Sequence, residues 1–87
     1  MAEDLEIYLL TFDPGSILDS SAHAAGTEEY LTLLEGSLRV SVSDREAWLH
    51  PGDFILYNCD VRHIIENPGE DTARLHMVVR FTKKQWG

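Results

Sequence analysis

The 87-residue chain has few of the residues that several common classes of small protein require. Its one cysteine, Cys59, excludes a framework of intramolecular disulfides and favours a reducing, cytoplasmic setting. Seven lysines and arginines against 15 aspartates and glutamates give a net charge of −8, which argues against direct binding to nucleic acid or to an anionic membrane surface. The sequence lacks a run of about 18 apolar residues, so it predicts no membrane span.

Helical patterns are also lacking, because the chain has no heptads, no internal repeats and no long amphipathic stretch. Short alternating runs are present instead, separated by glycine, proline, asparagine and aspartate, and this pattern predicts an all-β sandwich or barrel. We expect one domain over residues 1–87 with a frayed tail at 83–87, and a homodimer as the default for a chain of this size. The predicted strands span residues 5–12, 28–35, 38–42, 46–49, 53–57 and 72–82, with another after a turn at 58–60 and a short or irregular segment at 17–22.

Strand parity places two ionisable side chains in the predicted interior. Glu29 shares a face with Leu31 and Leu33, and His63 shares a face with Ile65. An unpaired charge in an apolar interior is costly, so these two side chains need a partner. They could pair with each other, or contact water, a ligand or a metal. These two ionisable residues in an apolar interior are the main functional clue in the sequence.

The stretch from Gly52 to Asn67, GDFILYNCDVRHIIEN, carries a recognisable spacing of glycine, histidine and asparagine. It matches the second motif of the cupins, G-x5-P-x-G-x2-H-x3-N, except that Asn58 replaces the proline and Asp60 the second glycine. His63 and Asn67 take the motif's histidine and final asparagine. We expect Asn67 to close the Asn-Pro-Gly turn.

The first cupin motif, G-x5-H-x-H-x3,4-E-x6-G, is present only in part. Its E-x6-G half is EYLTLLEG, from Glu29 to Gly36. If His23 is the first histidine, Ala25 stands in place of the second; with the longer spacing, both histidines fall on alanines. Gly15 also lies two residues too far from His23. The chain therefore resembles the cupin superfamily over residues 7–81, with a specific second motif and a partial first one.

The resemblance implies a small cupin β-barrel, also called a double-stranded β-helix or jelly roll. It also implies one divalent transition metal (iron, manganese, nickel or zinc) held by His23, Glu29 and His63, with one family histidine lost. Each of these three residues also has a simpler role open to it. His63 could be a core histidine bonded to backbone or to Glu29, Glu29 could be neutral or paired with His23, and His23 could belong to a mobile loop.

Further residues near the motifs have predicted roles. Tyr57, together with Glu29 and His63, is a candidate for binding a small molecule in the barrel. Trp48 and Tyr57 could line a pocket or an interface, but we expect both to pack in the core. Cys59 lies in a turn with no evident neighbouring base, so we expect no catalytic role for it.

The looser first motif resembles that of cupin domains that follow a helix-turn-helix in bacterial transcriptional regulators. This resemblance implies an effector-sensing domain that contacts no nucleic acid itself. The alternative is a stand-alone metal-dependent enzyme of the dioxygenase, isomerase or decarboxylase type. The missing histidine and the absence of a clear general acid or base weigh against catalysis. A third possibility is a structural barrel with a vestigial pocket.

Overall fold

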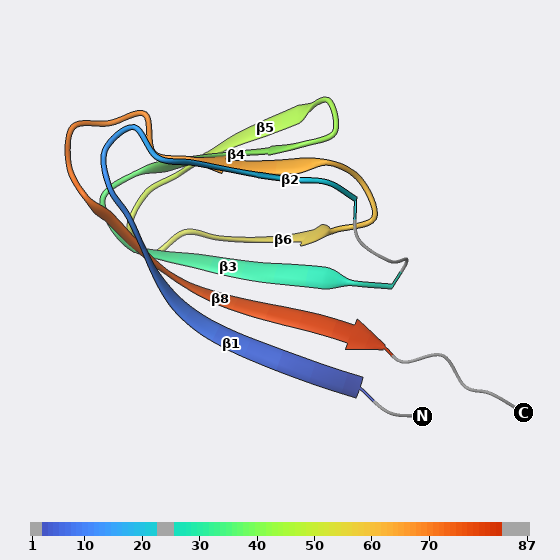
Figure 1. Ribbon diagram of the computed structural model, residues 1–87. Helices are drawn as coiled ribbons and strands as arrows, with labels where there is room; N and C mark the ends of the chain where they lie inside the picture. Colours follow the sequence, from blue (N-terminus) through green and yellow to red (C-terminus); the bar gives the residue numbers. More distant parts are fainter. Residues whose placement is uncertain (1–2, 23–25, 83–87) are drawn as a thin grey trace, which may run out of the picture.

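The computed structural model describes residues 3–22 and 26–82, and all of its regular elements are β-strands (Figure 1). None of the described residues forms a helix long and apolar enough to cross a membrane. The all-β prediction is confirmed, and the segment at 17–22 contains a short strand. The strands are β1 (Glu3–Phe12), β2 (Ile17–Ser20), β3 (Glu28–Glu35), β4 (Leu38–Val42), β5 (Arg45–Leu49), β6 (Phe54–Asn58), β7 (His63–Glu66) and β8 (Ala73–Thr82).

The strands form two four-stranded sheets that face each other as the layers of a sandwich (Figure 1). One sheet has the order β1-β8-β3-β6 and the other the order β2-β7-β4-β5, with every neighbouring pair antiparallel. Consecutive strands therefore often lie in different sheets, as the predicted jelly roll requires. The predicted tail at 83–87 lies outside the described residues.

The core fills the space between the two sheets, because every second residue of the central strands points inward. Each fully buried leucine or isoleucine contributes roughly 1.5–3 kcal/mol relative to an exposed one. The most deeply buried aliphatic side chains are Leu31 and Leu33 of β3, Leu38 and Val40 of β4, Ile65 of β7 and Leu75 of β8.

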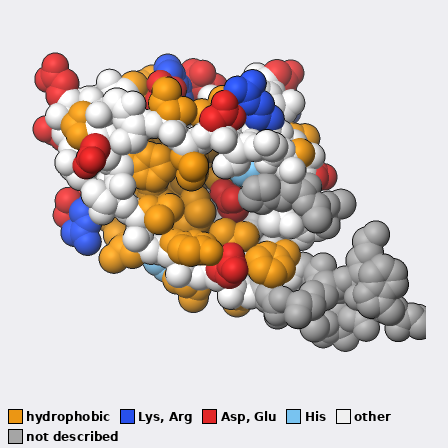
Figure 2. Space-filling view, in the orientation of Figure 1, with side chains coloured by type: hydrophobic (Ala, Val, Ile, Leu, Met, Phe, Trp, Pro, Cys, Tyr) orange, Lys and Arg blue, Asp and Glu red, His pale blue; other side chains and the backbone are white. Residues whose placement is uncertain are grey.

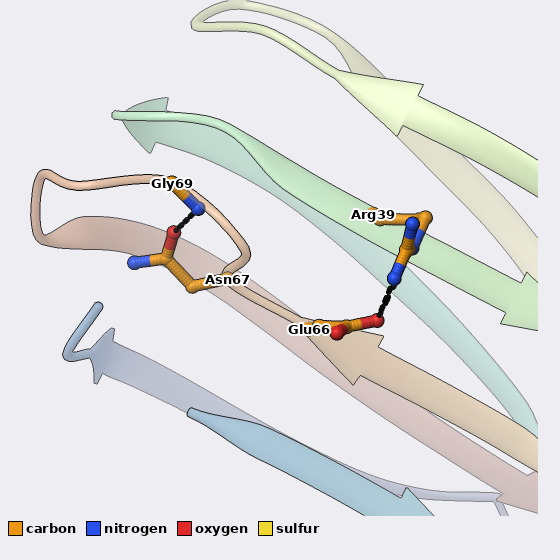
Figure 3. Close-up of polar contacts among 4 residues, drawn as sticks. All are labelled: Arg39, Glu66, Asn67 and Gly69. Carbon is orange, nitrogen blue, oxygen red and sulfur yellow. Dashed lines mark hydrogen bonds and ion pairs between the residues drawn. The ribbon is translucent and has the colours of Figure 1, made fainter. Parts of the chain in front are cut away.

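The loop after β7 is closed by a buried asparagine (Figure 3). Asn67 accepts a hydrogen bond at Oδ1 from the backbone N–H of Gly69, at 3.1 Å. Its Nδ2 donates to the carbonyl oxygens of Phe12, at 3.0 Å, and Asp71, at 2.8 Å. The turn-closing role that the motif predicts is therefore confirmed, and the same side chain also ties the loop to the end of β1.

Gly36 is the glycine at which the fold leaves no room for a side chain. Its φ of 81° is in the left-handed region, and a Cβ there would lie 2.7 Å from the carbonyl oxygen of Thr72. Gly52 has a similar φ of 93°, but a Cβ there would have no heavy atom within 4 Å. The two glycines thus share a backbone constraint and differ in packing.

We predict that Gly36→Ala destabilises the domain more than Gly52→Ala. Both substitutions place a Cβ on a left-handed residue, at a cost of about 1–2 kcal/mol. Only Gly36→Ala also pushes β3 and β8 apart, which adds about 1–3 kcal/mol. Urea denaturation of the two variants measures this difference, and equal losses in the free energy of unfolding would contradict the packing explanation.

Candidate ligand and metal site

Glu29 and His63 meet between the sheets, although they come from different ones. Glu29 lies on β3 and His63 begins β7. Oε2 of Glu29 is 3.6 Å from Nε2 of His63, and the two residues are 5% and 2% exposed. The structure therefore brings together the two inward-facing ionisable residues that strand parity indicated.

Tyr57 holds the other oxygen of this carboxylate. It is the cross-strand partner of Glu29, and its hydroxyl donates a hydrogen bond of 2.5 Å to Oε1. Its ring also lies 5.7 Å from the ring of His63, centre to centre. Burial, followed by the hydrogen bond to Glu29, raises the pKa of Tyr57 far above its usual range, so the hydroxyl remains a donor.

The backbone sets the tautomer of His63. Its Nδ1 is 2.9 Å from the carbonyl oxygen of Val61, which can only accept a hydrogen bond. We infer that Nδ1 carries the proton, so that in the neutral ring the lone pair is on Nε2, the atom near Glu29. A backbone bond of this kind orients histidines that ligate metals.

Cys59 is the member of the cluster that the sequence reasoning missed. One ligand atom each from Glu29, Cys59 and His63 lie within 4.8 Å of one another, and all three residues are buried. The backbone N–H of Cys59 donates to the carbonyl oxygen of Thr27, at 2.9 Å, which fixes the turn against the start of β3. A signal was available, because Cys59 follows Tyr57 by two residues and strand parity carries it to the same inward face.

The thiol of Cys59 is protonated in the metal-free domain. Burial raises the pKa of Cys59 well above its usual range, and the Glu29 carboxylate raises it further. A thiolate therefore forms here only if a positive charge replaces the proton.

The donors of this cluster suit a divalent metal. A carboxylate oxygen, a thiolate sulfur and an imidazole nitrogen are ligands of zinc and of similar borderline-soft ions. Such an ion would displace the Cys59 proton. Of the ligand set that the resemblance implied, the structure places Glu29 and His63 together, whereas His23 lies outside the described residues.

A cavity of about 400 Å³ opens beside the cluster, between the β1 side of one sheet and β2 of the other. Figure 2 shows hydrophobic side chains gathered in a hollow on this face. Glu29 belongs to both the cavity wall and the buried cluster. The wall consists of Glu6, Tyr8 and Leu10 of β1, Leu18 and Ser20 of β2, Thr27, Glu29, and Met77, Val79 and Phe81 of β8.

The expectation that Trp48 packs in the core was wrong. Trp48 is 50% exposed on β5, where the guanidinium of Arg39 lies 5.3 Å from its ring centre. Its neighbour in sequence, Leu49, takes the buried position. Strand parity explains the outcome, since adjacent residues of a strand point to opposite faces.

A family profile identifies the family, and two regulator proteins are similar to the chain. The profile of the cupin domain family matches residues 8–79, so the chain belongs to this family. The HTH-type transcriptional regulator SutR of Escherichia coli K12 is 27% identical over 90% of the chain and 44% of its own length. A crystal structure of an HTH_3 family transcriptional regulator from Vibrio cholerae superposes with a TM-score of 0.85 at 29% identity, over 91% of the chain and 44% of that protein.

The fold is also shared with an isolated domain. The crystal structure of the cupin domain of an XRE family transcriptional regulator from Enterobacter cloacae gives a TM-score of 0.85 at 19% identity, covering 91% of this chain and 83% of that one. The chain thus spans less than half of the Escherichia coli and Vibrio regulators but most of this isolated cupin domain.

We predict that Tyr57→Phe lowers the free energy of unfolding by about 1–3 kcal/mol, because it removes the hydroxyl donor from a buried carboxylate. Tyr8→Phe is the matched control, since Tyr8 donates a 2.8 Å hydrogen bond to Glu6 at an exposed position. Water replaces that donor, so its loss costs less than about 0.5 kcal/mol. Thermal denaturation compares the two variants, and a harmless Tyr57→Phe would show that Glu29 does not depend on this bond.

Proposed function

We propose that this domain binds a small molecule in the cavity beside Glu29 and acts as the effector-sensing module of a transcriptional regulator or of a regulator-like protein. The observation that carries the proposal is the cavity itself, since its volume of about 400 Å³ suits a small organic ligand. The similarity of this chain to two transcriptional regulators supports the sensing role. The charge of −8 supports a module that leaves DNA contacts to other parts of such a regulator.

The cavity wall indicates the class of ligand. Most of its side chains are apolar, and its charged members are Glu6 and Glu29. Among the described residues of the wall, none is a lysine, an arginine or a histidine. An anion would meet two carboxylates there with no compensating cation, at an electrostatic cost. We therefore infer a ligand with an apolar body and an uncharged or cationic polar group, such as an amine.

We predict that small alkyl and aryl amines bind more tightly than carboxylates with the same hydrocarbon body. Isothermal titration calorimetry on matched amine and carboxylate pairs tests this preference. Glu6→Gln should reduce the preference by about three- to tenfold, since it removes one nearby charge in a partly aqueous setting. Glu70→Gln, which removes an exposed charge from a loop outside the cavity wall, is the control and should leave the preference unchanged. A preference for the carboxylates would overturn the inferred ligand class.

We also propose that Glu29, Cys59 and His63 can hold one divalent metal, with zinc-like preference set by the Cys59 sulfur. Bound there, the metal would supply a positive charge and Lewis acidity at the inner end of the cavity. The same three ligands are the observation that favours the alternative function, a metal-dependent cupin enzyme. Among the described residues of the site, no further side chain has a clear role as a general acid or base. We therefore prefer the sensing role to the enzymatic one.

We predict that the purified domain binds cobalt(II) with an absorption band from sulfur-to-metal charge transfer. Cys59→Ser should abolish that band, and His63→Ala should abolish most of the binding itself, because each removes one of the three ligands. His76→Ala, on the outward-facing side of β8, is the control and should change neither result. Binding without a sulfur band in the wild type would exclude Cys59 as a ligand.

A further inference from the structure

We propose that the outer face of the sheet β1-β8-β3-β6 is the surface through which two copies of this chain associate. Cross-strand register places an apolar residue from every strand in one continuous row on this face: Ile7 of β1 opposite Val78 of β8, Val78 opposite Tyr30 of β3, and Tyr30 opposite Leu56 of β6. Leu9 and Phe54 lie beside the two ends of this row, at the edges of the sheet, and both are largely exposed. They end a neighbouring row whose middle positions are His76 and Thr32. The four residues of the apolar row, together with Leu9 and Phe54, are called the apolar face below.

The opposite sheet provides an internal comparison. Its corresponding row runs from Ile17 of β2 through Glu66 and Arg39 to Trp48 of β5. Arg39 donates hydrogen bonds to Glu66, and an ion pair therefore interrupts this row (Figure 3). Both sheets have four strands and a solvent-facing side, yet only the sheet β1-β8-β3-β6 has an uninterrupted apolar row across that side. A contiguous apolar patch of this kind is typical of an interaction site.

The charged side chains beside the apolar face favour a second copy as the partner. The acidic side chains described beside the face are paired with arginines of β8: Glu28 with Arg80 at 2.8 Å, and Glu35 with Arg74 at 3.7 Å. The chain as a whole carries a charge of −8, so two copies repel each other over most of their surfaces. On this face the paired charges cancel, and two copies can approach there without opposing carboxylates.

The size of the face also suits a dimer. The strands β1, β8, β3 and β6 have 10, 10, 8 and 5 residues, which is about eight on average. With strands about 4.8 Å apart and a rise of about 3.4 Å per residue, the sheet has a planar area of roughly 500 Å². Side chains raise the accessible area above this value, toward the roughly 800 Å² that each partner buries in a standard interface. A twofold axis through the middle of the row would bring Val78 and Tyr30 of one copy against the same residues of the other.

The test uses a matched pair of isoleucines on the edge strands of the two sheets. Ile7 is 66% exposed on β1 and Ile17 is 61% exposed on β2. Sedimentation equilibrium from about 1 to about 500 μM measures the dissociation constant in the range expected for an interface of modest size. We expect a wild-type dimer, weakened roughly 100-fold by Ile7→Lys because each copy then buries a lysine, and changed less than about threefold by Ile17→Lys.

Leu56→Lys, at the far end of the row, gives a second and independent disruption, and circular dichroism establishes that each variant is folded. Dissociation by both Ile7→Lys and Leu56→Lys, with Ile17→Lys still dimeric, would establish the interface. A wild-type chain that stays monomeric over the whole concentration range would overturn the proposal. So would a dimer that Ile17→Lys weakens as much as Ile7→Lys does, because the contact would then lie elsewhere.

Discussion

The buried contact between Glu29 and His63 is the constraint on which the rest of the site depends. Each sheet supplies one partner, so the contact forms only when the sandwich closes. Polar atoms withdrawn from water need partners, and the fold provides them through the Tyr57 hydroxyl and the Val61 carbonyl. The cluster is thus held in place without a ligand or a metal, and this order would lower the cost of the proposed binding.

The sandwich is asymmetric around this cluster. Glu29 reaches from the cluster into the cavity wall, so a molecule bound in the cavity and an ion bound by Cys59 and His63 would contact the same carboxylate. Binding at one place would therefore be coupled to binding at the other through a single side chain. The outer faces differ as well: the Arg39–Glu66 ion pair interrupts the corresponding row of one sheet, whereas an apolar row crosses the other without interruption. The proposed sites of ligand binding and association thus occupy opposite sides of the sheet β1-β8-β3-β6.

Most of the fold could be predicted from the sequence, because alternation of apolar and polar residues reports directly which side of a strand is buried. The same alternation predicted that Glu29 and His63 face inward. Their 3.6 Å contact could not be predicted from the sequence, because it depends on how the two sheets pack. Cys59 lies in the turn just after β6, and only the parity that continues from Tyr57 indicates that it faces inward. The large apolar ring of Trp48 favours the core, whereas its place next to the buried Leu49 puts it on the outer face, and the role of His23 stays a prediction.

The central claim is that ligands enter the cavity beside Glu29, and chemical-shift mapping by NMR tests it most directly. On titration with a small aryl amine, we expect the largest amide shifts at Thr27, Met77 and Val79, which belong to the cavity wall. Resonances on the outer face of β4 and β5 should remain unchanged. Shifts confined to the outer faces or the loops, or no saturable shifts with any member of the amine and carboxylate pairs, would contradict the account.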